Sequence, residues 1–148
     1  PGLTGPSPRK LQHSEGYPMA TLEELSGSRW PDPESDATPL VRKCAKYVKT
    51  DVSMLTNEGV RLLVGQRIHL KHLLPVALGR LMSDPWLEGD MYPGDLLKNV
   101  VGCAEEPEAL NFRSQIEDVA RVALAADIPE FMPDELMSGL LKILKREN

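Results

Sequence analysis

Apolar residues recur at three- and four-residue intervals along most of the chain, which is the pattern of amphipathic α-helices. The first clear case follows Thr38 and Pro39, since Thr supplies a capping oxygen and Pro suits the first helical position. The apolar face of this helix comprises Leu40, Val41, Cys44 and Val48. Thr56 predicts a second helix start, followed by the stripe Val60, Leu63, Val64 and Ile68.

The segment 70–82 is so rich in leucine that it predicts a central, buried helix. Pro75 removes one backbone donor, and we expect a new helix to begin near Leu74 rather than a kink. A short helix over 95–101 should end in a left-handed Gly102. Two further amphipathic helices are predicted, one from Phe112 until Pro129 and one after Pro133.

No segment alternates apolar and polar residues as a strand would, so the predicted fold class is all-α. We expect a compact single-domain bundle of five to six helices over residues 19–148. Residues 1–18 carry four prolines and three glycines, which predicts a flexible tail. Met19 resembles a natural translation start, so this tail is interpreted as an addition to the natural chain. The Pro-rich segment 26–39 is predicted to be a loop that Trp30 pins to the core.

Composition and charge exclude several classes of protein. The 148 residues contain no apolar run long enough to cross a bilayer, and the first 18 lack the apolar segment of a secretory signal. Two cysteines cannot build a disulfide framework or fill a four-ligand zinc site. A net charge of −5 argues against a general nucleic-acid binder. The sequence predicts a soluble, acidic, cytoplasmic domain without direct contacts to membrane or nucleic acid.

Candidate catalytic and metal-binding groups are few. His69 and His72 could lie on one side of a helix, but no HExxH-type framework surrounds them, so a metal-assisted hydrolase is the weakest alternative. Cys44 falls on an apolar stripe and is predicted to be a buried packing residue. No phosphate-binding or nucleophile-elbow motif is present in the sequence. We therefore expect no enzymatic activity, no cofactor and no metal.

The segment 84–97 stands out because it has four acidic residues and neither Lys nor Arg. Aromatic side chains can anchor a protein partner, while carboxylates steer a basic one. The predicted contacts with such a partner are Asp84, Trp86, Glu88, Asp90 and Tyr92. The alternative is that Trp86 and Tyr92 fill the core while Asp84 and Asp95 cap helices. Residues 104–148 add ten acidic residues against five basic ones.

The run Arg61–Leu97 resembles a helical group of immunity proteins from bacterial contact-dependent growth inhibition systems. The resemblance rests on RLL at 61–63, GQ at 65–66, LLP at 73–75, AL at 77–78, DP at 84–85, EGD at 88–90 and YPGDLL at 92–97. The opening TLEELSGSRWPDP, 21–33, is similar to the start of that family. His69 departs from the pattern, which has Gly there, and nothing beyond Val101 resembles the family.

This resemblance implies an antitoxin that binds the C-terminal toxin domain of a large surface protein, one to one, in the cytoplasm. Many such toxins are nucleases with basic substrate grooves, which an acidic protein could occlude. The shared motif could equally be scaffold, with specificity residues elsewhere. The competing function is a non-enzymatic helical adaptor or regulatory subunit that uses an apolar groove.

Overall fold

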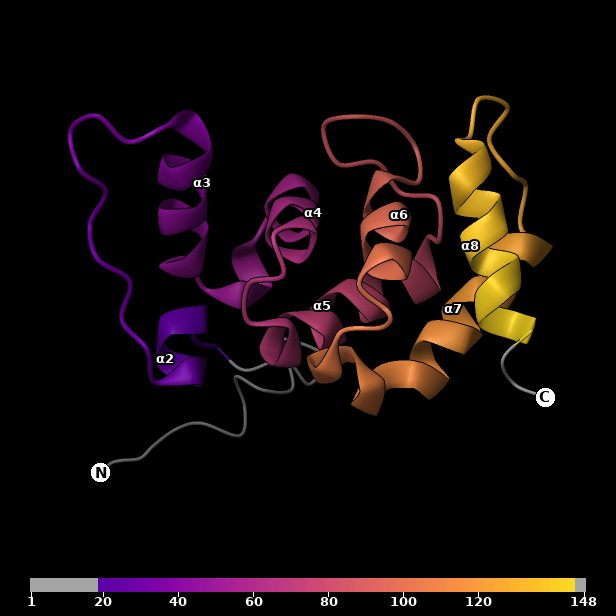
Figure 1. Cartoon of the computed structure of the whole chain (residues 1–148), viewed down its shortest axis with the longest axis horizontal. Coiled ribbons are helices and arrows are strands. Elements are labelled where there is room, and N and C mark those ends of the chain that lie inside the picture. Colours follow the sequence, from indigo (N-terminus) through magenta and orange to yellow (C-terminus); the bar gives the residue numbers. More distant parts are fainter. Residues whose placement is uncertain (1–18, 146–148) are drawn as a thin grey trace. The chain divides into compact units, whose positions relative to one another are not determined.

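The computed structural model describes residues 19–145, and the tail predicted over 1–18 lies outside them. Within the described range the all-α prediction is confirmed, with seven α-helices against the five to six expected, and no strand. The α-helices are α2 (Leu22–Ser26), α3 (Pro39–Val48), α4 (Asn57–Gly65), α5 (Leu70–Ser83), α6 (Asp95–Gly102), α7 (Arg113–Ala125) and α8 (Asp134–Lys145). Two 3-10 helices, η1 (Val52–Met54) and η2 (Pro107–Phe112), complete the elements (Figure 1).

By their contacts the helices form two compact units, one ending at Leu55 and one beginning at Thr56. The first unit contains α2, α3 and η1 and buries Leu22, Cys44, Val48 and Val52. Its long loop is tied down through the backbone of Trp30, as the N–H donates to Glu23 Oε2 at 2.7 Å and the carbonyl accepts from Lys49 Nζ at 2.8 Å. The loop is thus held at Trp30, but through the main chain and on Glu23 and Lys49; the expected attachment to the core stays a prediction.

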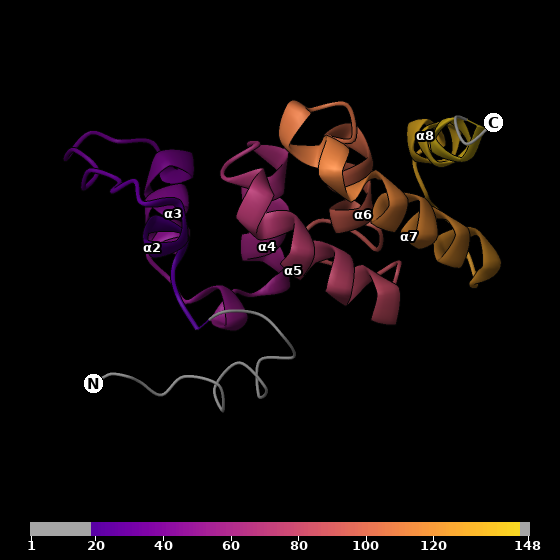
Figure 2. The same ribbon diagram turned by 90° about the horizontal axis from the view of Figure 1, so that it is seen from below.

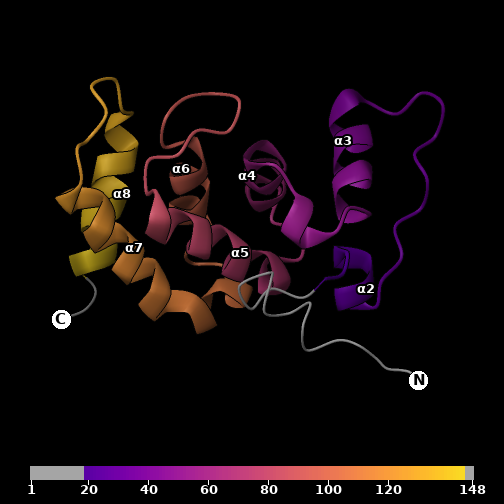
Figure 3. The same ribbon diagram turned by 180° about the vertical axis from the view of Figure 1, so that it is seen from behind.

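The second unit is built around α5, whose buried residues include Leu70, Leu73, Leu74 and Leu81. This helix contacts α4, α6, α7 and η2. It runs roughly crosswise to α6, as both the front and the rear view show (Figures 1 and 3). The last helix, α8, packs on α6 and α7, and from below it is seen nearly end-on while α7 runs across the view (Figure 2).

The predicted helix starts at Thr38 and Thr56 are confirmed, since each hydroxyl accepts a backbone N–H of the first turn. The apolar face of α3 is only partly buried, because Leu40 and Val41 remain 41% and 46% exposed.

Two expectations about helix ends are wrong. The helix at Pro75 starts earlier, at Leu70, and Pro75 lies inside it. The ring costs one hydrogen bond there, and the buried leucines on both sides hold the helix together. Gly102 is the last residue of α6 and has no left-handed conformation; among the described glycines Gly27 and Gly94 have a positive φ.

Candidate functional site

The loop that joins α5 to α6, residues 84–94, is closed by its own backbone. Leu87 N–H donates to Asp84 O at 3.2 Å, and Gly94 N–H donates to Leu87 O at 3.1 Å. Glu88 and Pro93 form an isolated antiparallel bridge. These contacts turn a Pro- and Gly-rich segment into a defined loop, which we call the acidic loop.

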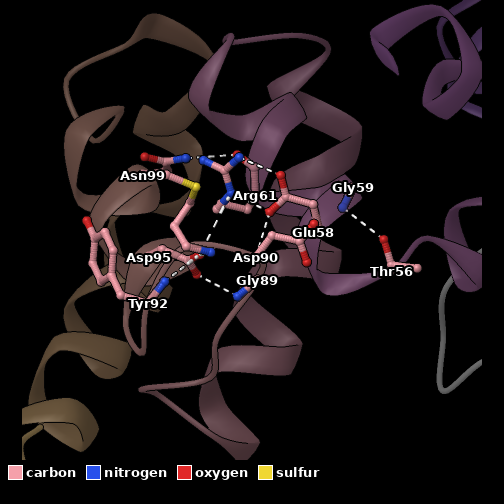
Figure 4. Close-up of polar contacts among 10 residues, drawn as sticks. Thr56, Glu58, Gly59, Arg61, Gly89, Asp90, Tyr92, Asp95 and Asn99 are labelled. Atoms are coloured by element: carbon pink, nitrogen blue, oxygen red, sulfur yellow. Dashed lines mark hydrogen bonds and ion pairs between the residues drawn. The ribbon is translucent and has the colours of Figure 1, made fainter. Parts of the chain in front are cut away.

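Two carboxylates hold the tip of the acidic loop (Figure 4). Asp95, at the start of α6, is 2% exposed, and it accepts N–H groups from Gly89 at 2.7 Å, Met91 at 3.0 Å and Tyr92 at 3.4 Å. Glu58 in α4 accepts the N–H of Asp90 at 2.9 Å. The backbone donors of four residues are therefore satisfied by side chains that approach from two helices.

Arg61 balances the negative charge of these two carboxylates. Its guanidinium donates twice to Glu58, with both N–O distances 2.6 Å, and lies 3.8 Å from Asp95. The hydrogen bonds with Glu58 raise the pKa of Arg61. Asn99 of α6 donates to the carbonyl of Arg61 at 2.9 Å, which ties α6 to α4. The Glu58–Arg61–Asp95 group is a partly buried network that fixes the loop.

The glycines of the shared motif leave room for this network. A Cβ on Gly89 would lie 2.8 Å from Glu58 Oε1 and 3.1 Å from Asp95 Oδ2. Gly94 has a φ of +93°, and a Cβ there would lie 2.8 Å from the Trp86 ring. Gly89 and Gly94, which belong to the motif that supports the family resemblance, are therefore needed for the packing of the loop.

The five predicted contact residues all lie on the acidic loop but differ in exposure. Asp84, Glu88 and Asp90 are exposed, while Tyr92 is half-buried. Trp86 is 7% exposed, and its indole N–H donates to Ala123 O of α7 at 3.0 Å. Its ring therefore fills the core beneath the loop, as the alternative interpretation of this residue proposed.

Of the two Asp residues expected to cap helices, Asp84 lies at a cap position, whereas the N-cap of α6 is Gly94 and not Asp95. Asp84 is the C-cap of α5 and donates its backbone N–H to Arg80 O at 3.0 Å. Asp95 folds the loop that precedes it. The network with Glu58 and Arg61 was not predicted, and its one signal in the sequence is that Arg61 belongs to the shared motif.

The candidate thiols are buried, and the two candidate histidines belong to no metal-binding group of the described residues. The described residues contain no group of three or more His, Cys, Asp or Glu side chains arranged to hold a metal ion. Cys44 and Cys103 are buried, and burial raises the pKa of Cys103 to about 11. Burial also lowers the pKa of His72. In the described range, no helix is both long and apolar enough to span a membrane.

A helical scaffold that presents a clamped loop with exposed carboxylates offers a surface complementary to a basic protein partner. Comparison with protein families identifies its kind: the model of the CDI immunity proteins matches residues 24–114. The match covers more than half of the chain, so this protein belongs to the CDI immunity proteins, which bind and neutralise a cognate toxin. The matched range begins in the first unit and ends in the second. Searches of curated proteins and of solved structures found no match.

Proposed function

We propose that this protein is a non-enzymatic, cofactor-free inhibitor that forms a one-to-one complex in the cytoplasm with the C-terminal domain of its cognate toxin. The toxin in this proposal is a nuclease whose active site is occluded in the complex. Residues 19–148 form the immunity domain. Family membership and the surplus of acidic side chains support this proposal.

The observation that carries the occlusion model is the clamped acidic loop. Asp84, Glu88 and Asp90 are exposed on a loop whose backbone is held by Asp95 and Glu58. Preorganised carboxylates lose little conformational freedom on binding and can take the place of phosphates in a basic groove. Trp86 positions the loop from below, and Tyr92 contributes contacts at its edge.

Calorimetric titration with the toxin domain encoded immediately upstream tests the proposal directly. We expect one-to-one binding at nanomolar affinity or tighter, together with loss of toxin activity. Absence of binding to a folded, active toxin would overturn the proposal. A complex that still binds the toxin's nucleic-acid substrate would overturn the occlusion model, while leaving neutralisation intact. Removal of residues 1–18 should leave the affinity unchanged.

A double charge reversal tests the loop itself. Glu88→Lys with Asp90→Lys removes two exposed carboxylates, while the backbone N–H of Asp90 can still donate to Glu58. We expect slower association and a weaker dependence of its rate on salt. The matched control is Glu34→Lys with Asp36→Lys, which changes the net charge equally at exposed sites of the first unit. Equal association rates for the two double variants would contradict a contact at the acidic loop.

A further inference from the structure

The loop between α7 and α8, residues 126–133, exposes a large aromatic side chain. Phe131 is 87% exposed, the highest value among the exposed large apolar residues of the described chain, and Ile128 nearby is 40% exposed. Exposure of a whole phenyl ring to water is unfavourable by about 2 kcal/mol, so a ring at a loop tip is a candidate anchor for a partner.

Acidic residues flank this ring along the sequence. The segment 127–141 contains Asp127, Glu130, Asp134 and Glu135 but neither Lys nor Arg. In the part of the chain that the structure describes, Glu135 pairs with Lys98 at 2.8 Å, whereas Asp127, Glu130 and Asp134 enter no ion pair. An exposed aromatic side chain flanked in sequence by exposed carboxylates complements an apolar pocket rimmed by Lys and Arg.

Two prolines stiffen the loop. Pro129 and Pro133 flank the turn at Glu130 and Phe131, and the pyrrolidine ring fixes φ at each proline. A loop that is already restricted loses less entropy when a partner orders it. The two prolines therefore restrict the backbone on either side of Phe131.

The α7–α8 loop and the acidic loop lie on the same side of the second unit. Each leads into the N-terminus of a helix, α6 or α8, and both starts face the same way (Figure 1). The two helices are in contact, and the Lys98–Glu135 pair joins them. The hydrogen bond to Glu135 raises the pKa of Lys98, and the neighbouring Tyr92 raises it further.

The α7–α8 loop lies outside the range 24–114 that matches the family. The motif within that range builds the scaffold, as the roles of Gly89 and Asp95 show. An immunity protein must recognise one toxin, and residues outside the shared scaffold are free to differ between proteins with different toxins.

We propose that the α7–α8 loop is a second toxin contact, in which Phe131 inserts into an apolar pocket of the cognate toxin rimmed by basic residues. This inference rests on the proposed function. A second copy of this chain is a poor occupant, because a two-fold interface would bring the unpaired carboxylates of Asp127, Glu130 and Asp134 against one another.

Phe131→Ala tests the proposal in the full chain with the upstream-encoded toxin domain. The ring is almost fully exposed, so the variant should fold as the parent does, which circular dichroism can verify. We expect the dissociation constant of the toxin complex to rise on the order of 30-fold or more, as for an interface hot spot. The matched control is Leu110→Ala, an exposed apolar residue of η2 that lies outside the α7–α8 loop.

The outcomes separate this inference from the proposed function. Tight binding by the parent chain with equal affinities for both variants would overturn the role of Phe131 but leave the immunity function standing. Failure of the parent chain to bind would remove the proposed function itself. Light scattering of the free proteins completes the test: a dimer that Phe131→Ala dissociates would show self-association and overturn the assignment to the toxin.

Discussion

His69 occupies a backbone conformation that glycine adopts more easily. Its φ is 47° and its ψ is 48°, and its Nε2 is buried without a hydrogen-bond partner among the described residues. The resemblance to the immunity proteins predicts Gly at this position, and glycine adopts a left-handed backbone more easily than any other residue. The departure at His69 is thus a local strain at the start of α5.

Substitution of His69 should favour Gly over Ala. Both variants lose the imidazole, but Ala keeps the left-handed penalty of about 1–2 kcal/mol while Gly adds about 0.4–1 kcal/mol of unfolded-state entropy. We expect His69→Gly to exceed His69→Ala in stability by about 1 kcal/mol in urea unfolding. Lys71, exposed in α5, is the control: there Ala should be the more stable variant by about 1 kcal/mol. If the Ala variant were the more stable of the two at position 69, as at position 71, backbone strain at His69 would be contradicted.

At the scale of elements, the acidic loop depends on Asp95. In Asp95→Asn one acceptor oxygen becomes a donor, so an N–H of Gly89 or Met91 loses its partner. Arg61 also loses its negatively charged neighbour at 3.8 Å. We expect a loss of about 3 kcal/mol in the free energy of unfolding, because the site is buried. Asp118→Asn, at an exposed ion pair with Arg121, should cost about 0.5 kcal/mol or less. Similar losses in the two variants would show that the loop is not held by Asp95.

The long loop of the first unit should respond to acid through Glu23. Hydrogen bonds from Lys49 and then from the Trp30 N–H lower its pKa from the ordinary value of 4.5. The stabilisation is therefore complete above pH 4.5 and is lost as the pH falls through the lowered pKa. We expect the NMR shift of the Trp30 amide to titrate with a midpoint below 4.5, and Glu23→Gln to abolish that transition. A titration midpoint at or above pH 4.5 would contradict the lowered pKa of Glu23.

The elements that the sequence predicts well are those with local signals. The starts of α3 and α4 follow from capping threonines, and the helical class follows from apolar spacing. The start of α5 has no side-chain cap, so no capping residue at His69 indicates where this helix begins. Pro75, which lies inside the helix, led to the wrong predicted start. The clamp on the acidic loop joins Glu58 to Asp90, which lie far apart in sequence, so only the packing of α4 beside α6 reveals it.

At the scale of the whole molecule, the two loops should act at different stages of binding. Net charge and exposed carboxylates act over a distance of about one Debye length, so they govern the encounter. An aromatic anchor acts only after contact, and truncating it mainly changes dissociation. The acidic loop and Phe131 therefore make separable contributions to the same affinity.

Stopped-flow or surface-based kinetics with the cognate toxin can separate them. We expect Glu88→Lys with Asp90→Lys to lower the association rate constant and flatten its dependence on ionic strength, with a smaller change in dissociation. Phe131→Ala should raise the dissociation rate constant on the order of 30-fold at any salt concentration, while association changes by less than about threefold. If both variants altered the same rate constant with the same salt dependence, the two loops would have to act in a single step, and the division between steering and anchoring would fail.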